Sequence, residues 1–253
     1  EKMRIKYIIS SDNRVRNFNN YIKSEFPEFL EEENPDLILV AGGDGALHHA
    51  VQKYYHLNVP FLGKACGTFN FLMNEFDDKD GVLDRLVKNK VSLNTYSFRN
   101  IVVSLNGQEI GEAVNDVIIG GSIMNYFKFN LTTENKSLEN FEVRGTGICI
   151  STVIGSTAFN FNNNGNVLPL DSNLWSLTGI VCNRHLNDLI KPQRIEIKSN
   201  GGKVFLSGVE KTELTKNDSL VLKEGSTVRL AFLDKEKFLS RRIELANRCR
   251  LEK

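Results

Sequence analysis

The sequence predicts two domains of different class, an α/β domain followed by an all-β, sandwich-like domain. Before about residue 97, short apolar runs alternate with segments of helical spacing, which is typical of a parallel sheet covered by helices. After residue 97, short β-type segments follow one another with turn residues between them. The length of 253 residues is also large for one hydrophobic core and favours two domains.

The first domain, residues 1–97, is expected to contain three strands and two helices. Pro27 ends the first helical segment. Ligands of open α/β sheets bind at the carboxyl ends of the strands, so the residues that follow each strand matter most. In chain order the expected elements are a strand at 4–10, a helix at 18–26, a strand at 37–40, a helix at 46–55 and a strand at 61–63.

A glycine-rich turn with one acidic residue follows the second strand, where residues 41–45 read Ala-Gly-Gly-Asp-Gly. Glycines such as Gly43 and Gly45 let a ligand approach the main chain closely, and the N–H groups at the start of the next helix can face an anion. Asp44 would repel a phosphate, so a role as a base or next to a cation suits it better than simple binding. The alternative is an ordinary turn in which Asp44 caps the helix.

The second domain, residues 98–234, is expected to consist of strands and turns, and 235–253 is expected to be a helix that returns to the first domain. Asn106-Gly107 is a strong hairpin signal, and 200–202 is a second turn. The expected strands lie at 100–105, 110–119, 126–132, 142–143, 147–152, 194–198, 204–207 and 220–222.

Composition restricts the function classes. The net charge of +1 and the mixing of acidic and basic residues give no basic surface for nucleic acid, and no run approaches the roughly 18 apolar residues that span a bilayer. The first residues lack the apolar core of a signal peptide, and the four cysteines are far apart, which indicates reduced thiols rather than disulfides or zinc ligands. We therefore expect a cytoplasmic protein with no nucleic-acid or membrane partner and no metal site made by its own side chains.

Neither the early Gly-x-Gly-x-x-Gly dinucleotide signature nor a Walker-type loop is present. Instead, three further motifs follow the glycine turn in order: 67–75 with the sequence Gly-Thr-Phe-Asn-Phe-Leu-Met-Asn-Glu, Asn115-Asp116, and 147–159, which ends in Gly-Ser-Thr-Ala-Phe and is continued by 165–170. Together the four motifs resemble the NAD kinase family, which phosphorylates NAD to NADP.

The resemblance implies a Rossmann-like α/β domain followed by a β-sandwich domain that binds the dinucleotide. It implies that Asp44 is the catalytic base, with Mg²⁺ or another divalent cation on the phosphates and with ATP or polyphosphate as the phosphoryl donor. NAD and ATP would be the small-molecule substrates. It also suggests a homodimer or homotetramer with sites near the subunit contacts.

The same resemblance assigns nucleotide contacts. Asn115 and Asp116 would hold ribose hydroxyls, since an amide beside a carboxylate offers both donor and acceptor groups; the alternative is a turn or bulge between strands. Phe71 and Leu72 would form an apolar wall for adenine, or else belong to the core. The remaining expected contacts are Thr146, Thr157, Ala158, Phe159 and Asn162.

The sequence departs from the family pattern at four single positions and at 160–164, where Asn-Phe-Asn-Asn-Asn replaces a stretch usually richer in serine and alanine. Asn70 stands at the second glycine of its motif, Val153 stands where proline is usual, and Phe159 replaces tyrosine. Thr146 occupies the place of an aspartate that contacts the nicotinamide end in many members. These changes imply weaker NAD affinity, a different selectivity between NAD and NADH, or a fold kept for binding only.

Two other functions fit parts of the pattern. Diacylglycerol and sphingosine kinases share a Gly-Gly-Asp-Gly turn in a similar two-domain plan, although their substrate domain needs an apolar slot. A non-catalytic dinucleotide sensor would use the same fold without chemistry, and the presence of Asp44 argues against it.

Overall fold

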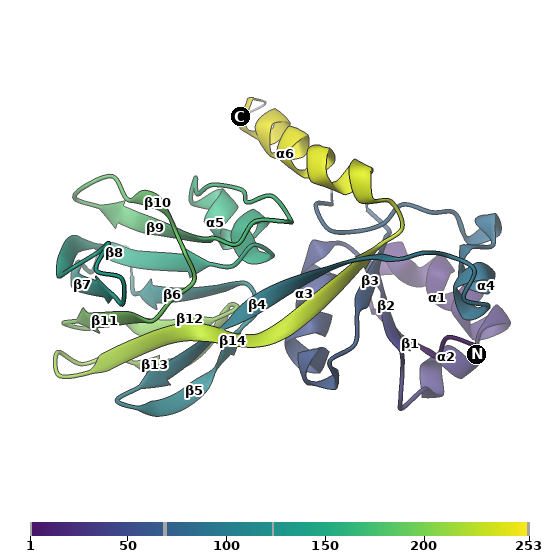
Figure 1. The fold of residues 1–253 in the computed structure, drawn as a ribbon, viewed down its shortest axis with the longest axis horizontal. Helices are drawn as coiled ribbons and strands as arrows, with labels where there is room; N and C mark the ends of the chain where they lie inside the picture. The colour runs from purple at the N-terminus through teal and green to yellow at the C-terminus, as the bar shows by residue number, and fades with distance from the viewer. Residues whose placement is uncertain (1, 68–69, 123, 252–253) are drawn as a thin grey trace. The chain divides into compact units, whose positions relative to one another are not determined.

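The computed structural model describes residues 2–67, 70–122 and 124–251 (Figure 1). The chain forms two compact units, one of residues 1–97 and 228–253 and one of residues 98–227. Residues 228–234, which the sequence pattern placed in the second domain, lie in the first unit, because the end of strand β14 (Ser219–Phe232) pairs there with β3. One unit is α/β and the other is β-rich, which agrees with the fold class predicted from the sequence.

The first unit contains a parallel sheet in the order β1 (Ile5–Ile8), β2 (Leu37–Gly42), β3 (Phe61–Ala65) and the end of β14. All six residues of β2 are buried, as expected for a strand covered on both faces. The three predicted strands are confirmed within a few residues at each end. Their carboxyl ends lead to residues 9–14, 43–45 and 66–70.

The two predicted helices of this unit are also present, as α1 (Arg16–Glu25), which ends before Pro27, and α3 (Asp44–Tyr54). α2 (Glu28–Glu31) and α4 (Val82–Val87) were not predicted, because four and six residues are too few for a helical period. The described part of this unit also contains the 3₁₀ turns η1 (Asn13–Val15), η2 (Tyr55–Leu57) and η3 (Asp78–Asp80). The C-terminal helix is α6 (Lys235–Leu251). Among the described residues, no helix is both long and apolar enough to cross a membrane.

The second unit is built from antiparallel strands around its own hydrophobic core. β14 pairs with β11, and the order continues β7, β8, β6, β12, β13, while β9 and β10 extend from β8, and β4 pairs with β5. The strands are β4 (Asn94–Leu105), β5 (Gln108–Ala113), β6 (Asp116–Gly120), β7 (Phe127–Thr133), β8 (Phe141–Ser151), β9 (Trp175–Cys182), β10 (Asn187–Ile190), β11 (Ile195–Ser199), β12 (Lys203–Leu206) and β13 (Val209–Glu213); the short helical segments are η4 (Gly155–Thr157) and α5 (Phe159–Asn162).

The predicted hairpin at Asn106-Gly107 is confirmed. Its central residues have φ angles of 51° and 86°, and Leu105 pairs with Gln108, as in a two-residue turn that needs positive φ at both positions.

Two strand predictions were wrong. The segment 110–119 is not one strand, because the chain bends at Val114 and Asn115 between β5 and β6. Conversely, 142–143 and 147–152 form a single strand, β8. The prediction left 144–146 out of both segments, and Gly145 in this gap is needed for packing, since a Cβ there would lie 2.4 Å from Cys182 Sγ.

Candidate active site

Asp44 is the first residue of α3 and directly follows the turn at Gly42 and Gly43. Gly42 has φ of +146°, and a Cβ there would lie 2.9 Å from that of Ala46, so the turn requires glycine at this position. The N-cap position of this helix is Gly43, and Asp44 lies in its first turn. The geometry therefore does not support the interpretation of Asp44 as a helix cap.

The Asp44 carboxylate is instead held by the glycine-rich segment. The backbone N–H of Phe71 donates to Oδ2 at 2.7 Å and that of Leu72 donates to Oδ1 at 3.0 Å. Burial raises the pKa of Asp44, whereas these two hydrogen bonds and the nearby positive charge of Arg242 act to lower it. The carboxylate is thus fixed in orientation, and each oxygen keeps a further acceptor position.

The side chains of Phe71 and Leu72 lie inside the first unit, with 5% and 1% of their surface exposed. The sequence pattern did not reveal that their main-chain N–H groups bind Asp44. Gly45 has open space around its Cα, while Gly43 lies next to the side chain of Asn70. Thr68 and Phe69 of the same motif lie outside the described residues.

Asn74, which the sequence analysis did not single out as a site residue, fixes the end of this segment. Its Nδ2 donates to Gly63 O at 3.0 Å and to Ala231 O at 3.3 Å, and its Oδ1 accepts from Leu233 N at 2.9 Å. The residue is 1% exposed. Asn74 therefore ties the segment that holds Asp44 to the sheet.

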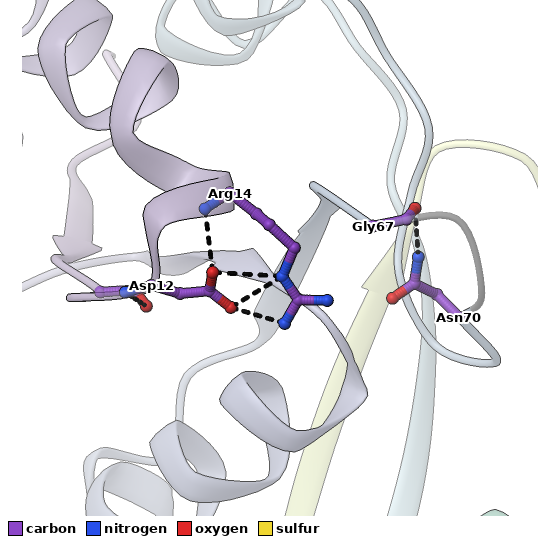
Figure 2. A network of polar contacts seen from close by, with 5 residues as sticks. Asp12, Arg14, Gly67 and Asn70 are labelled. Atoms are coloured by element: carbon purple, nitrogen blue, oxygen red, sulfur yellow. Dashed lines mark hydrogen bonds and ion pairs between the residues drawn. The ribbon is translucent and has the colours of Figure 1, made fainter.

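A second polar group lies at the ends of β1 and β3, as Figure 2 shows. The Asp12 carboxylate binds the backbone N–H and the guanidinium of Arg14, and Asn70 Nδ2 donates to Gly67 O at 3.0 Å. A Cβ on Gly67 would lie 3.4 Å from Arg14 Nη1. Arg14 was not among the predicted site residues.

In the second unit, Asn115 lies in the bend between β5 and β6. Ser207 Oγ accepts from the backbone N–H groups of Val114 at 3.0 Å and Asn115 at 3.1 Å, which holds the bend open. Asn115 Oδ1 is buried and has no hydrogen-bond partner. The bend is thus present, as the alternative interpretation expected, and it carries an unsatisfied acceptor.

The long motif at 147–159 packs against this bend. Thr152 N donates to Asn115 O at 2.8 Å, and Thr152 Oγ1 donates to Val114 O at 2.6 Å. A Cβ on Gly155 would lie only 2.0 Å from Asn115 O. The structure therefore brings together two motifs that are far apart in the sequence.

Asp116 begins β6 and is 3% exposed. Burial raises its pKa to about 7, so it exchanges a proton near neutral pH. Burial and the charge of Asp116 together raise the pKa of the Cys149 thiol.

The segment after Gly155 is held by buried polar groups. Asn160 Nδ2 donates to Ser156 O at 3.1 Å and to Asn166 O at 2.9 Å, and Ser176 Oγ donates to Asn160 Oδ1 at 3.0 Å. Around this scaffold Thr157 and Ala158 are half-buried, whereas Phe159 and Asn162 are exposed.

A cavity of about 650 Å³ lies within the second unit, and both Thr146 and Phe159 line it. Thr146 Oγ1 donates to Ile180 O at 2.9 Å. The other predicted contacts of this unit, Asn115, Asp116, Thr157, Ala158 and Asn162, are not part of its lining. Further walls come from the apolar side chains of Ile118, Phe127, Ile180 and Phe205 and from Lys203 and Glu210.

Comparison with solved structures decides the fold. The structure of yeast NADH kinase complexed with NADH aligns with a TM-score of 0.76 and 17% identity over 96% of this chain and 87% of that one. An NAD kinase from Archaeoglobus fulgidus in complex with ATP aligns with a TM-score of 0.71 and 19% identity over 97% and 99% of the two chains. The chain has the fold of NAD kinases.

Sequence comparison also finds NAD kinases, although no protein-family model matches. The NAD kinase of Rickettsia bellii is 36% identical over 155 residues, which span 60% of this chain and 59% of that one. The NAD kinase of Rickettsia rickettsii is 37% identical over 154 residues, with the same coverage. The chain thus matches about three fifths of the length of these NAD kinases.

Proposed function

We propose that the chain is an NAD kinase, which transfers a phosphoryl group from ATP or polyphosphate to the 2′-hydroxyl of the adenosine ribose of NAD and gives NADP. The observation that carries the proposal is the carboxylate of Asp44, held by two backbone N–H groups at the carboxyl edge of a parallel sheet. The fold and sequence similarity to NAD kinases supports it.

Asp44 is the proton acceptor in this proposal. A ribose hydroxyl is a poor nucleophile near neutral pH, and phosphoryl transfer depends on positioning, charge neutralisation and removal of the hydroxyl proton. Burial raises the pKa of Asp44 and strengthens it as a base, while the Phe71 and Leu72 N–H groups and Arg242 favour its ionised form. The fixed carboxylate leaves acceptor positions for the incoming hydroxyl.

A divalent cation, Mg²⁺ in this proposal, would enter with the phosphates. Mg²⁺ commonly binds through one or two carboxylates together with substrate phosphates and water, where it neutralises phosphate charge. Asp44 is the carboxylate that the glycine turn offers. Within residues 2–67, 70–122 and 124–251, no group of three or more His, Cys, Asp or Glu side chains is placed to hold a metal.

Asn115 and Asp116 are the proposed ribose clamp. Asn115 Oδ1 is a buried acceptor without a partner, and buried polar groups are normally hydrogen-bonded. A ligand hydroxyl would supply the missing donor. Asp116 beside it would accept from a second hydroxyl in its ionised form.

The other nucleotide contacts follow from the positions of the predicted residues. We propose that Thr146 and Phe159 contact the dinucleotide from the cavity that they line, and that Thr157, Ala158 and Asn162 contact it from the segment that follows Gly155. In the first unit, Gly43 and Gly45 would approach the nucleotide through the main chain. Phe71 and Leu72 are the proposed adenine wall, although their side chains are buried in the unit.

We further propose a homodimer or homotetramer in the cytoplasm. Apolar side chains with 39% to 53% exposure, namely Phe159, Val181, Leu189 and Val209, offer surface for contacts between copies, and the four cysteines are free thiols, as in a reducing compartment. Light scattering of the purified protein measures its mass in solution, and a monomer at all concentrations would contradict the oligomer.

The test of the proposed function is incubation with NAD, Mg²⁺ and either ATP or polyphosphate, with NADP measured by an NADP-specific dehydrogenase. NADP is expected with at least one donor. Diacylglycerol with ATP serves as the comparison, because phosphorylation of the lipid alone would favour the lipid-kinase alternative. Tight NAD binding without any NADP would favour the sensor.

A further inference from the structure

Asn70 carries a buried acceptor that the fold does not satisfy. The residue is 6% exposed, and its Oδ1 has no hydrogen-bond partner. The amide orientation is fixed because Nδ2 donates to Gly67 O at 3.0 Å. In Figure 2 the Oδ1 atom points away from that bond.

The free oxygen is directed at the glycine turn of Asp44. Asn70 Oδ1 lies 3.3 Å from the position that a Cβ on Gly43 would occupy, and Gly43 directly precedes Asp44. Asn70 in turn directly precedes Phe71, whose N–H holds the Asp44 carboxylate. The amide oxygen of Asn70 therefore faces the turn that precedes the Asp44 carboxylate.

The chemistry of this pair restricts the ligand group that Asn70 can bind. An ionised phosphate oxygen has no hydrogen to donate. Mg²⁺ commonly binds through carboxylates, substrate phosphates and water, whereas Asn70 offers a neutral amide oxygen. A hydroxyl is neutral and donates one hydrogen, and the two vicinal hydroxyls of a ribose match the amide and carboxylate acceptors.

We propose that Asn70 is a substrate-binding residue whose Oδ1 accepts a hydrogen bond from the 3′-hydroxyl of an adenosine ribose. The proposal rests on the function proposed above, in which Asp44 receives the proton of the neighbouring 2′-hydroxyl. The ribose is therefore that of NAD; ATP presents the same diol, and the test compares the two ligands. A glycine at position 70, as in the family pattern, could not make this contact.

The test is a calorimetric titration of NAD, 3′-deoxyadenosine-NAD, ATP and 3′-deoxy-ATP into the wild-type protein and Asn70→Ala. A hydrogen bond of ordinary strength corresponds to about three- to tenfold in affinity. The wild type should bind NAD about three- to tenfold more tightly than its 3′-deoxy form, and in Asn70→Ala this ratio should fall to about one. A ratio that collapses for ATP and not for NAD would overturn the assignment to the ribose of NAD.

Equal ratios in the wild type and the Asn70→Ala variant, or no preference for the 3′-hydroxyl in the wild type, would overturn the proposal. Asn34→Ala, at an exposed position of the same unit, is the matched control and should keep the wild-type ratios. Asn70→Gly replaces the alanine variant if the latter does not fold. Because titration needs no turnover, a protein that binds NAD but makes no NADP contradicts the proposed function without deciding the role of Asn70.

Discussion

Gly155 lies against the main-chain carbonyl of Asn115, and a Cβ at Gly155 would stand 2.0 Å from that oxygen. Thr152, three residues earlier, donates its backbone N–H to the same carbonyl. The proposed ribose clamp and the segment proposed to contact the rings of the dinucleotide are therefore one packed structure within the second unit.

Gly155→Ala should consequently damage stability and binding together. Inserting a methyl group into a packed site costs about 1–3 kcal/mol, and here the obstacle is backbone, which cannot rotate away. We expect a lower midpoint of urea unfolding and weaker NAD binding by calorimetry. Gly45→Ala is the stability control, because a Cβ there meets nothing within 4 Å; equal stability of the two variants would show that the contact at Gly155 is relieved easily.

Asp44→Asn should lower turnover by ~10²–10⁴, the usual effect of losing a general base. The amide keeps the size of the carboxylate but offers only one acceptor to the Phe71 and Leu72 N–H groups. We expect kcat for NADP formation to fall while circular dichroism shows a folded protein that still binds NAD. Unchanged kcat would remove Asp44 from the chemistry.

Asp116 makes stability depend on pH. Its pKa is raised by burial from the usual 3.8 to about 7, so between about pH 4 and pH 7 the folded protein holds a proton that the unfolded chain releases, and stability falls as pH rises through this window. The free energy of unfolding of Asp116→Asn should therefore increase relative to that of the wild type as the pH rises, by roughly 4 kcal/mol at pH 8. Urea unfolding at pH 4, 6 and 8 measures the gain, and a constant difference between the two proteins would contradict the raised pKa.

Phe159→Tyr should tighten NAD binding by up to roughly tenfold, since a net hydrogen bond contributes about 0.5–1.5 kcal/mol. Phe159 lines the cavity of the second unit and is 39% exposed, so the added hydroxyl can reach water and need not lose a partner. Calorimetry on both proteins decides the outcome. Weaker binding by the variant would mean that the cavity is shaped around the phenyl ring.

The sequence was sufficient to predict the elements that carry a periodic or turn signal. The buried run of β2, the helix after Asp44 and the Asn106-Gly107 hairpin depend on neighbouring residues, so local patterns reveal them. β8 and the single strand predicted at 110–119 were misjudged because the shapes of these segments depend on partners: Gly145 packs against Cys182, and the bend at Asn115 is held by Ser207.

The same distinction applies to the candidate site. Motifs located Asp44 and Asn115, but not the groups that orient them. Ser207 is 92 residues away from Asn115, and Asn74 is 157 residues away from Ala231. Serine and asparagine are common in turns and at the surface, so only the folded chain shows that these two side chains serve the site.

Transfer of labelled phosphate from γ-labelled ATP to NAD, in the presence of Mg²⁺, tests the central claim most directly. The account predicts that the wild-type protein places the label on the 2′-position of the adenosine ribose, and that Asp44→Asn does so at least a hundredfold more slowly, the lower bound of the ~10²–10⁴ effect of losing a general base. Polyphosphate labelled in the same way covers the second donor. No labelled NADP from either donor, with NAD bound and the protein folded, would contradict the assignment of this chain as an NAD kinase.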